Sequence, residues 1–205
     1  TSVTVPVTVI DDNTVETGGE TVIVTLSSTN TAVTVATAPN NTATGTISDN
    51  DASVVSIAAT AQASEPSTNG EFTLTLTNPV SVATTVTYAV TGTATSAADY
   101  ASAGTTVVIP ANTTSVTVPV TVIDDNTVET GGETVIVTLS STNTAVTVAT
   151  APNNTGTVTI SDNDASVVSI AATAQASEPS TNGEFTLTLT NPVSVATTVT
   201  FAVTG

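Results

Sequence analysis

The chain has 205 residues, of which 17 are acidic and none is lysine, arginine or histidine, so its formal net charge is −17. Without cations it lacks the groups that neutralise phosphate, which argues against nucleic acids and anionic membrane surfaces as partners. The lack of histidine, lysine, arginine and cysteine also removes the usual bases, electrophiles and thiol nucleophiles, so we expect no enzyme. Apolar residues make up 39% of the chain, which is enough for a folded core and is not typical of disorder.

A unit of 113 residues recurs along the chain, because Thr1 corresponds to Thr114 and Gly92 corresponds to Gly205. We predict that residues 1–51 are the C-terminal half of one repeat, 52–164 a complete repeat, and 165–205 the N-terminal half of the next. Half a β-domain cannot bury its own core, so we expect a window from a longer tandem array. The overlapping copies differ at three positions, Ala43/Gly156, Gly45/Val158 and Tyr88/Phe201.

Another possibility is that the two half-repeats of neighbouring chains complete each other. Together these halves lack the stretch that corresponds to Thr93–Thr113. Completion between chains therefore fits the sequence poorly.

Apolar and polar residues alternate in short segments of the complete repeat, and Gly, Pro, Asn and Asp separate the segments. Seven or eight such strands predict an all-β fold, a two-sheet sandwich repeated in tandem. Pro119 lies inside one pattern, which predicts an edge strand or a bulge. We expect no helix, and no apolar run reaches the roughly 20 residues of a membrane helix. In chain order the predicted strands are 53–59, 71–77, 85–90, 105–110, 115–122, 134–139, 145–150 and 155–161.

The acidic residues of the complete repeat gather in loops rather than along strands. Two carboxylates about 5 Å apart repel by roughly 3 kcal/mol at an effective dielectric of 20, so a group of them needs a cation. No basic side chain is available, and Ca²⁺ is the simplest candidate because it takes 6–8 oxygen ligands from irregular loops. Zinc would require His or Cys. A solvated acidic surface without an ion is the alternative. The loops are "SEPSTNG" (64–70), "SAADY" (96–100), "IDDNTVETGGE" (123–133) and "SDND" (161–164).

Four of these sequences occur in an order and spacing that resemble the Calx-β domain, a calcium-binding domain of sodium–calcium exchangers, integrin β4 and large bacterial surface proteins. They are "SEP" (64–66), "GTATSAADY" (92–100), "VTVIDDNTVETGGETVIVTL" (120–139) and "ISDND" (160–164). The resemblance spans the whole complete repeat. It implies a seven-stranded, antiparallel, Ig-like or Greek-key β-sandwich with calcium at one tip. By position, the implied ligands are Glu65, Asp99, Asp124, Asp125, Glu129, Asp162 and Asp164.

The partial repeats carry the matching pieces of the implied site. Seven carboxylates are too many for one Ca²⁺, so we expect two or more ions per complete repeat. Glu133 is either a further ligand or simply the start of the next strand, and Asn163 stands where some family members carry an acid. Gly131–Gly132 should let the backbone turn back into that strand. The partial sites contain Asp11, Asp12, Glu16, Asp49 and Asp51 in the first copy and Glu178 in the last.

These features predict a calcium-stiffened stalk, spacer or fibre body of a large secreted or cell-surface protein, with no membrane insertion of this segment. Ions near Asp162 and Asp164 would tie the loops to the linker and fix the angle between copies. The expected partners are neighbouring repeats. The alternatives are a subunit of an extracellular filament or surface layer, in which identical chains associate, and an adhesin or other ligand-binding module.

Overall fold

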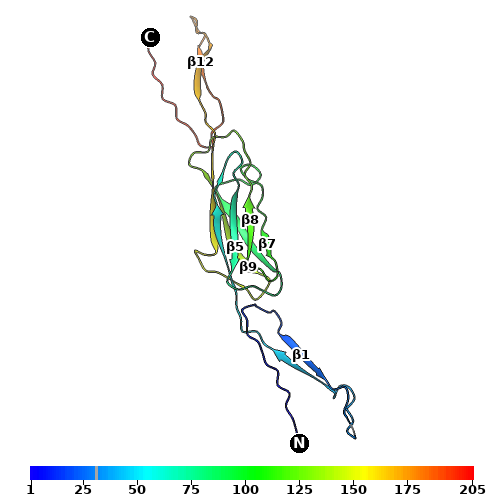
Figure 1. Cartoon of the computed structure of the whole chain (residues 1–205). Coiled ribbons are helices and arrows are strands. Elements are labelled where there is room, and N and C mark those ends of the chain that lie inside the picture. The colour runs from blue at the N-terminus through cyan, green and yellow to red at the C-terminus, as the bar shows by residue number, and fades with distance from the viewer. Residues whose placement is uncertain (31) are drawn as a thin grey trace.

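The computed structural model describes residues 1–30 and 32–205, which form three parts along one long axis (Figure 1). A β-sandwich occupies the middle. A hairpin of β1 (Glu20–Thr25) and β2 (Thr42–Ile47) lies at the N-terminal end, and a hairpin of β12 (Val168–Ala174) and β13 (Glu184–Leu189) lies at the other end. Residues 1–30 and 32–205 contain no helix long and apolar enough to cross a membrane.

The middle part is a two-sheet sandwich, as the sequence predicts. One sheet has four strands in the order β10-β3-β5-β8, and the other has five in the order β4-β11-β9-β6-β7. The strands are β3 (Val54–Ala61), β4 (Ala63–Ser64), β5 (Gly70–Leu76), β6 (Thr84–Gly92), β7 (Thr106–Ile109), β8 (Ser115–Val120), β9 (Glu133–Thr142), β10 (Thr147–Val148) and β11 (Thr155–Ser161).

The alternation in the sequence directs every second side chain between the two sheets. In β5, Phe72, Leu74 and Leu76 are buried, and in β9 the same holds for Val135 and its alternate neighbours. Such a period of two is what one buried sheet face requires. One member of this core, Val15, comes from the preceding partial repeat.

Several details of the strands differ from the prediction. The short strand β4 was not predicted, and β10 covers only two residues of the predicted 145–150. Both pair in parallel, β4 with β11 and β10 with β3, within a sandwich whose other pairs are antiparallel. A two-residue strand is too short to show an alternating pattern, which explains why the sequence did not predict β4 or the true length of β10. The prediction for Pro119 is confirmed, because β8 is an edge strand.

The two hairpins leave their apolar faces open. Val24 in β1 is 43% exposed and Phe185 in β13 is 70% exposed, whereas their counterparts Val137 and Phe72 are fully buried. These hairpins lack the second sheet that covers the same residues in the sandwich. The exact repeat boundaries, 1–51, 52–164 and 165–205, stay a prediction.

Candidate metal centre

The acidic loops of the complete repeat meet at one end of the sandwich. Glu65 directly follows β4, and its amide donates to the carbonyl of Ser161 at the end of β11 (2.9 Å). Asp99 lies between β6 and β7, and its carbonyl accepts the amide of Ile123 in the β8–β9 loop (3.0 Å). These backbone contacts join the four loops in two pairs, and the amide of Glu129, which donates to Asp162 (3.0 Å), connects the two pairs.

Two groups of three carboxylates have oxygens within 4.8 Å of one another. One consists of Glu65, Glu129 and Asp162, and the other of Asp99, Asp125 and Glu129. Glu129 belongs to both groups. The structure therefore gathers five of the seven predicted ligands into two adjacent clusters that share one side chain.

Backbone amides orient several of these carboxylates. Asp162 accepts the amide of Glu129 at 3.0 Å on Oδ2 and the amide of Asp164 at 2.8 Å on Oδ1. Asp125 accepts the amide of Thr127 at 2.5 Å. The bonds from Thr127 and Asp164 hold their carboxylates within their own loops, so part of the cluster is positioned by local structure, whereas the bond from Glu129 joins two loops.

The two glycines after Glu129 return the chain to the sandwich, as the sequence predicts. Both have positive φ, 100° for Gly131 and 73° for Gly132, which side-chain-bearing residues rarely adopt. A Cβ on Gly132 would also lie 2.9 Å from the carbonyl oxygen of Ile160. Glycine at this position thus allows the β8–β9 loop to approach the end of β11.

Glu65 is the most enclosed of the predicted ligands. Its side chain is 6% exposed, and its Oε2 has no hydrogen-bond partner among the described residues. Burial raises the pKa of Glu65 to about 7, and the negative charges of Asp162 and Glu129 add to this increase, against a backbone hydrogen bond from Asn163. A buried, unpaired carboxylate oxygen is costly unless a cation or a proton satisfies it.

Glu133 fits both interpretations that the sequence left open. It is the first residue of β9, and its buried Oε2 likewise lacks a hydrogen-bond partner in the described part of the chain. Burial raises the pKa of Glu133 to about 8, with hydrogen bonding to Asp99 and the charge of Asp99 as further causes. The carboxylate therefore lies beside the cluster that contains Asp99.

Two predicted ligands lie outside both clusters. Asp124 is exposed, and its Oδ1 accepts a long hydrogen bond of 3.4 Å from the Asn163 side chain. Asp164 has a buried Oδ2 without a partner in the described residues, and burial together with the charge of Asp162 raises its pKa. Burial also raises the pKa of Glu129, with Asp125 and Asp162 contributing.

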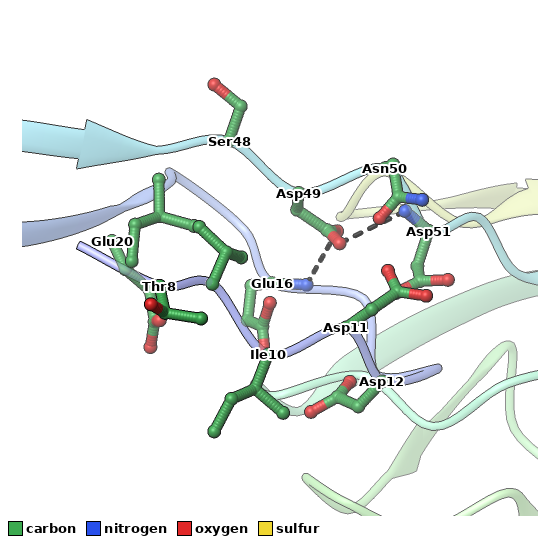
Figure 2. Close-up of a pocket in the computed structure, with 12 residues that line it drawn as sticks. Thr8, Ile10, Asp11, Asp12, Glu16, Glu20, Ser48, Asp49, Asn50 and Asp51 are labelled. Atoms are coloured by element: carbon green, nitrogen blue, oxygen red, sulfur yellow. Dashed lines mark hydrogen bonds between the residues drawn. The ribbon is translucent and has the colours of Figure 1, made fainter. Parts of the chain in front are cut away.

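The first partial repeat reproduces one side of this arrangement. Figure 2 shows its acidic residues around a cavity of about 270 Å³. Asp49 accepts the amides of Glu16 (2.9 Å) and Asp51 (3.0 Å), the counterparts of the bonds to Asp162, and these amides lower its pKa, Asp51 more than Glu16. The predicted residues at this cavity are Asp11, Asp12, Glu16, Asp49 and Asp51.

Glu178 in the last partial repeat is exposed, and the loop 176–182 around it contains no other acid. The structure does not bring it to another predicted ligand.

The donor set of the complete repeat suits a hard divalent cation. The clustered side chains are all carboxylates, and the sequence has no cationic side chain. One oxygen of a clustered side chain, Oε2 of Glu65, and the nearby Oε2 of Glu133 are buried without a hydrogen-bond partner among the described residues. Calcium accepts such oxygen-only sets from loops, whereas zinc prefers His and Cys. The carboxylate clusters are thus compatible with calcium.

Several solved structures are similar to this chain. The apo form of the Calx CBD1 domain is 21% identical, with a TM-score of 0.47, over 56% of this chain and all of that one. The two-domain CBD12 of CALX1.2 is 22% identical, with a TM-score of 0.45, over 53% of this chain and 45% of that one. A two-domain protein of unknown function from Bacteroides fragilis is 10% identical, with a TM-score of 0.39, over 60% and 55% of the two chains.

No curated protein matches the sequence. The family model of the Calx-beta domain matches twice, over residues 1–51 and 49–164, which together make up most of the chain. This match covers the sandwich and all four acidic loops. The chain therefore belongs to the Calx-beta family.

Proposed function

We propose that the chain is a non-enzymatic structural segment of a secreted or cell-surface repeat protein, stiffened by Ca²⁺ at the acidic end of each repeat. The observation that carries this proposal is the pair of carboxylate clusters that share Glu129 and include Glu65, whose buried Oε2 has no partner among the described residues, in a chain with no cationic side chain. Calx-beta family membership and the oxygen-only donor set both favour calcium.

The shared residue favours two ions per complete repeat. Glu65, Glu129 and Asp162 would hold one ion, and Asp99, Asp125 and Glu129 the other, with Glu133 beside the second. A carboxylate has two oxygens, so Glu129 can contribute to both sites. Two divalent ions would also offset more of the local negative charge than one ion could.

The mechanical role follows from where the clusters lie. Asp162 belongs to the run that links the complete repeat to the next one, and it also accepts the amide of Glu129 from the β8–β9 loop. An ion held by Asp162 and Glu129 would add a second tie between the loop and the linker. Removing the ion would leave repelling carboxylates at the junction, which would loosen it.

A structural role also suits the near-identity of the copies and their end-to-end arrangement in Figure 1. A series of nearly identical units determines the length of the segment that they form. The filament and ligand-binding alternatives gain no specific support from residues 1–30 and 32–205 and stay alternatives.

The direct test is thermal unfolding of the whole chain in millimolar Ca²⁺, in excess chelator, and in Mg²⁺. Both tyrosines, Tyr88 and Tyr100, are buried in the complete repeat, so their fluorescence follows that repeat alone. At a hundredfold excess over the dissociation constant, ligand binding should add about 2.7 kcal/mol of stability per site. Titration calorimetry should show two ions for the complete repeat. Equal melting temperatures in calcium and chelator would refute the proposal.

A further inference from the structure

The acidic loop of one repeat contacts the next repeat at both junctions in the chain. At the first junction, the amide of Val15 donates to the carbonyl of Pro79 (2.9 Å), and the amide of Ser81 donates to the carbonyl of Val15 (3.0 Å). At the second, Val128 makes the same two bonds, with Pro192 (3.0 Å) and Ser194 (3.1 Å). The contact therefore recurs from copy to copy.

The side chain of this valine enters the core of the following repeat. Val15 is 2% exposed and pairs in parallel with Val80, which is 1% exposed. Both belong to the hydrophobic core of the complete repeat. A residue from one copy thus completes the core of the next, and burying a valine side chain is favourable.

The covalent linker is fastened to the same segment that holds the valine. The Ser53 hydroxyl donates to the carbonyl of Asn78 (2.8 Å), and the Asn78 side chain donates to the carbonyl of Ala52 (2.8 Å). Ser166, Asn191 and Ala165 repeat this pattern at the second junction, with 2.8 Å for both bonds. Residues 78–81 therefore contact both the linker, at Ala52 and Ser53, and the preceding repeat, at Val15, which opposes rotation about the linker.

Among the residues that the structure describes, a second loop lies beside the valine segment at the first junction only. Asn143, Thr144 and Ala145 line the same surface as Glu16, Thr17 and Gly18, directly beside Val15. Residues 165–205 contain no counterpart of this loop. Val128 is accordingly half-buried, whereas Val15 is fully buried.

We propose that Val15 and Val128 are docking residues, each of which seats in a socket at the N-terminal end of the following repeat. The socket consists of Pro79–Ser81 and the loop Asn143–Ala145. The partner that this surface fits is the neighbouring copy of the same repeat. This inference goes beyond the proposed calcium binding, because the docking contacts involve no carboxylate.

The test is amide hydrogen exchange measured by NMR on the full chain, with and without Ca²⁺. The Ser81 amide donates to the carbonyl of Val15, so its exchange reports docking directly. Val15→Ala should speed exchange at Ser81 by on the order of tenfold or more, while amides in the centre of β9 such as Val137 stay protected. Val33→Ala is the matched control, because Val33 lies in the same partial repeat but is 65% exposed.

Three outcomes would overturn the proposal. They are an unprotected Ser81 amide in the unmodified chain, equal effects of Val15→Ala and Val33→Ala, and an effect of Val15→Ala that reaches Val137 equally. Slower exchange at Ser81 than at Ser194 would support it, since only the first socket is complete. Protection of Ser81 in chelator would separate docking from calcium binding, so that failure of either proposal leaves the other testable.

Discussion

The complete repeat and the partial repeats place the same side chains in opposite environments. Phe72 in β5 is fully buried, whereas its counterpart Phe185 in β13 is 70% exposed. Yet the strand pairing is the same in both. Val55 in β3 pairs with Leu76 in β5, and Val168 in β12 pairs with Leu189 in β13. In each of these two strand pairs the register shifts two residues before the end of the first strand. Hairpin register is thus set locally, whereas burial depends on strands from the rest of the repeat.

The acidic ends show the same division. Asp49 in the partial repeat and Asp162 in the complete repeat accept equivalent amides at nearly equal distances. Among the described residues, both three-carboxylate groups lie in the complete repeat, because only there do Glu65 and Asp99 arrive from other strands. One arm of the site forms from local sequence, and the full site requires the whole sandwich.

The largest difference between the two environments should appear on truncating the paired phenylalanines. Phe72→Ala would leave a cavity in the core and should cost about 3–5 kcal/mol, whereas Phe185→Ala should cost close to nothing in the complete repeat. Chemical denaturation followed by tyrosine fluorescence measures both. Equal losses of stability for the two variants would show that the last hairpin packs on the sandwich in solution.

The second largest difference is expected in the calcium-dependent stability of variants at two corresponding glutamates, Glu129 in the complete repeat and Glu16 in the first partial repeat. Glu129→Gln removes the carboxylate that both clusters share and should abolish most of the calcium-dependent gain in stability, which is about 2.7 kcal/mol for each site at a hundredfold excess of ligand. Glu16→Gln, at the same position of the partial repeat, should leave the gain intact. Melting curves with Ca²⁺ and with chelator decide the point, and an unaltered gain in the Glu129 variant would contradict the shared ligand.

The sequence predicts the features that arise from regular patterns. Alternation locates the long strands and their inward residues, and Pro119 marks an edge strand correctly. The two-residue strands β4 and β10 cannot be recognised from the sequence pattern, because they are too short to show alternation and depend on parallel pairing with distant strands. The burial of Val15 is not predicted for a related reason. This residue lies within an acidic loop, and the core that buries it belongs to another repeat.

The metal site is likewise predicted only in part from the sequence. The charge argument and the family resemblance identify the four loops, and the structure brings together Glu65, Asp99, Asp125, Glu129 and Asp162. The sequence does not separate Asp124 and Asp164 from these five, because side-chain direction within a loop follows from backbone hydrogen bonds. Which residues bind an ion stays a prediction.

One of the few sequence differences between copies should have a moderate effect. A Cβ on Gly156 would lie 2.9 Å from Cδ1 of Phe72, so Gly156→Ala forces the ring to shift and should cost about 1–3 kcal/mol. The first repeat has Ala43 at this position, where its hairpin lacks the covering sheet. Gly45→Ala is the control, since nothing lies within 4 Å of its Cβ. Denaturation midpoints measure the two effects. If both variants have the same midpoint as the unmodified chain, the prediction is wrong.

The smallest effect should be the pH dependence of the calcium-free chain. Glu65 and Glu133 have folded-state pKa values of about 7 and about 8, above the ordinary value of 4.5. The folded state therefore binds more protons than the unfolded state between about pH 4.5 and 8, so stability is highest below this window and falls as pH rises through it.

We expect this loss to be roughly 1 kcal/mol, because loop carboxylates without an ion can move apart into water. Melting temperatures in chelator at pH 5 and pH 8.5 measure the loss, and the double variant Glu65→Gln, Glu133→Gln should reduce it, whereas the exposed Glu184→Gln should not. Calcium competes with protons for the same oxygens, so its affinity should rise across this pH window. A calcium-free chain equally stable at both pH values would mean that the acidic end opens without its ion, and that the cation assembles the site rather than filling a preformed one.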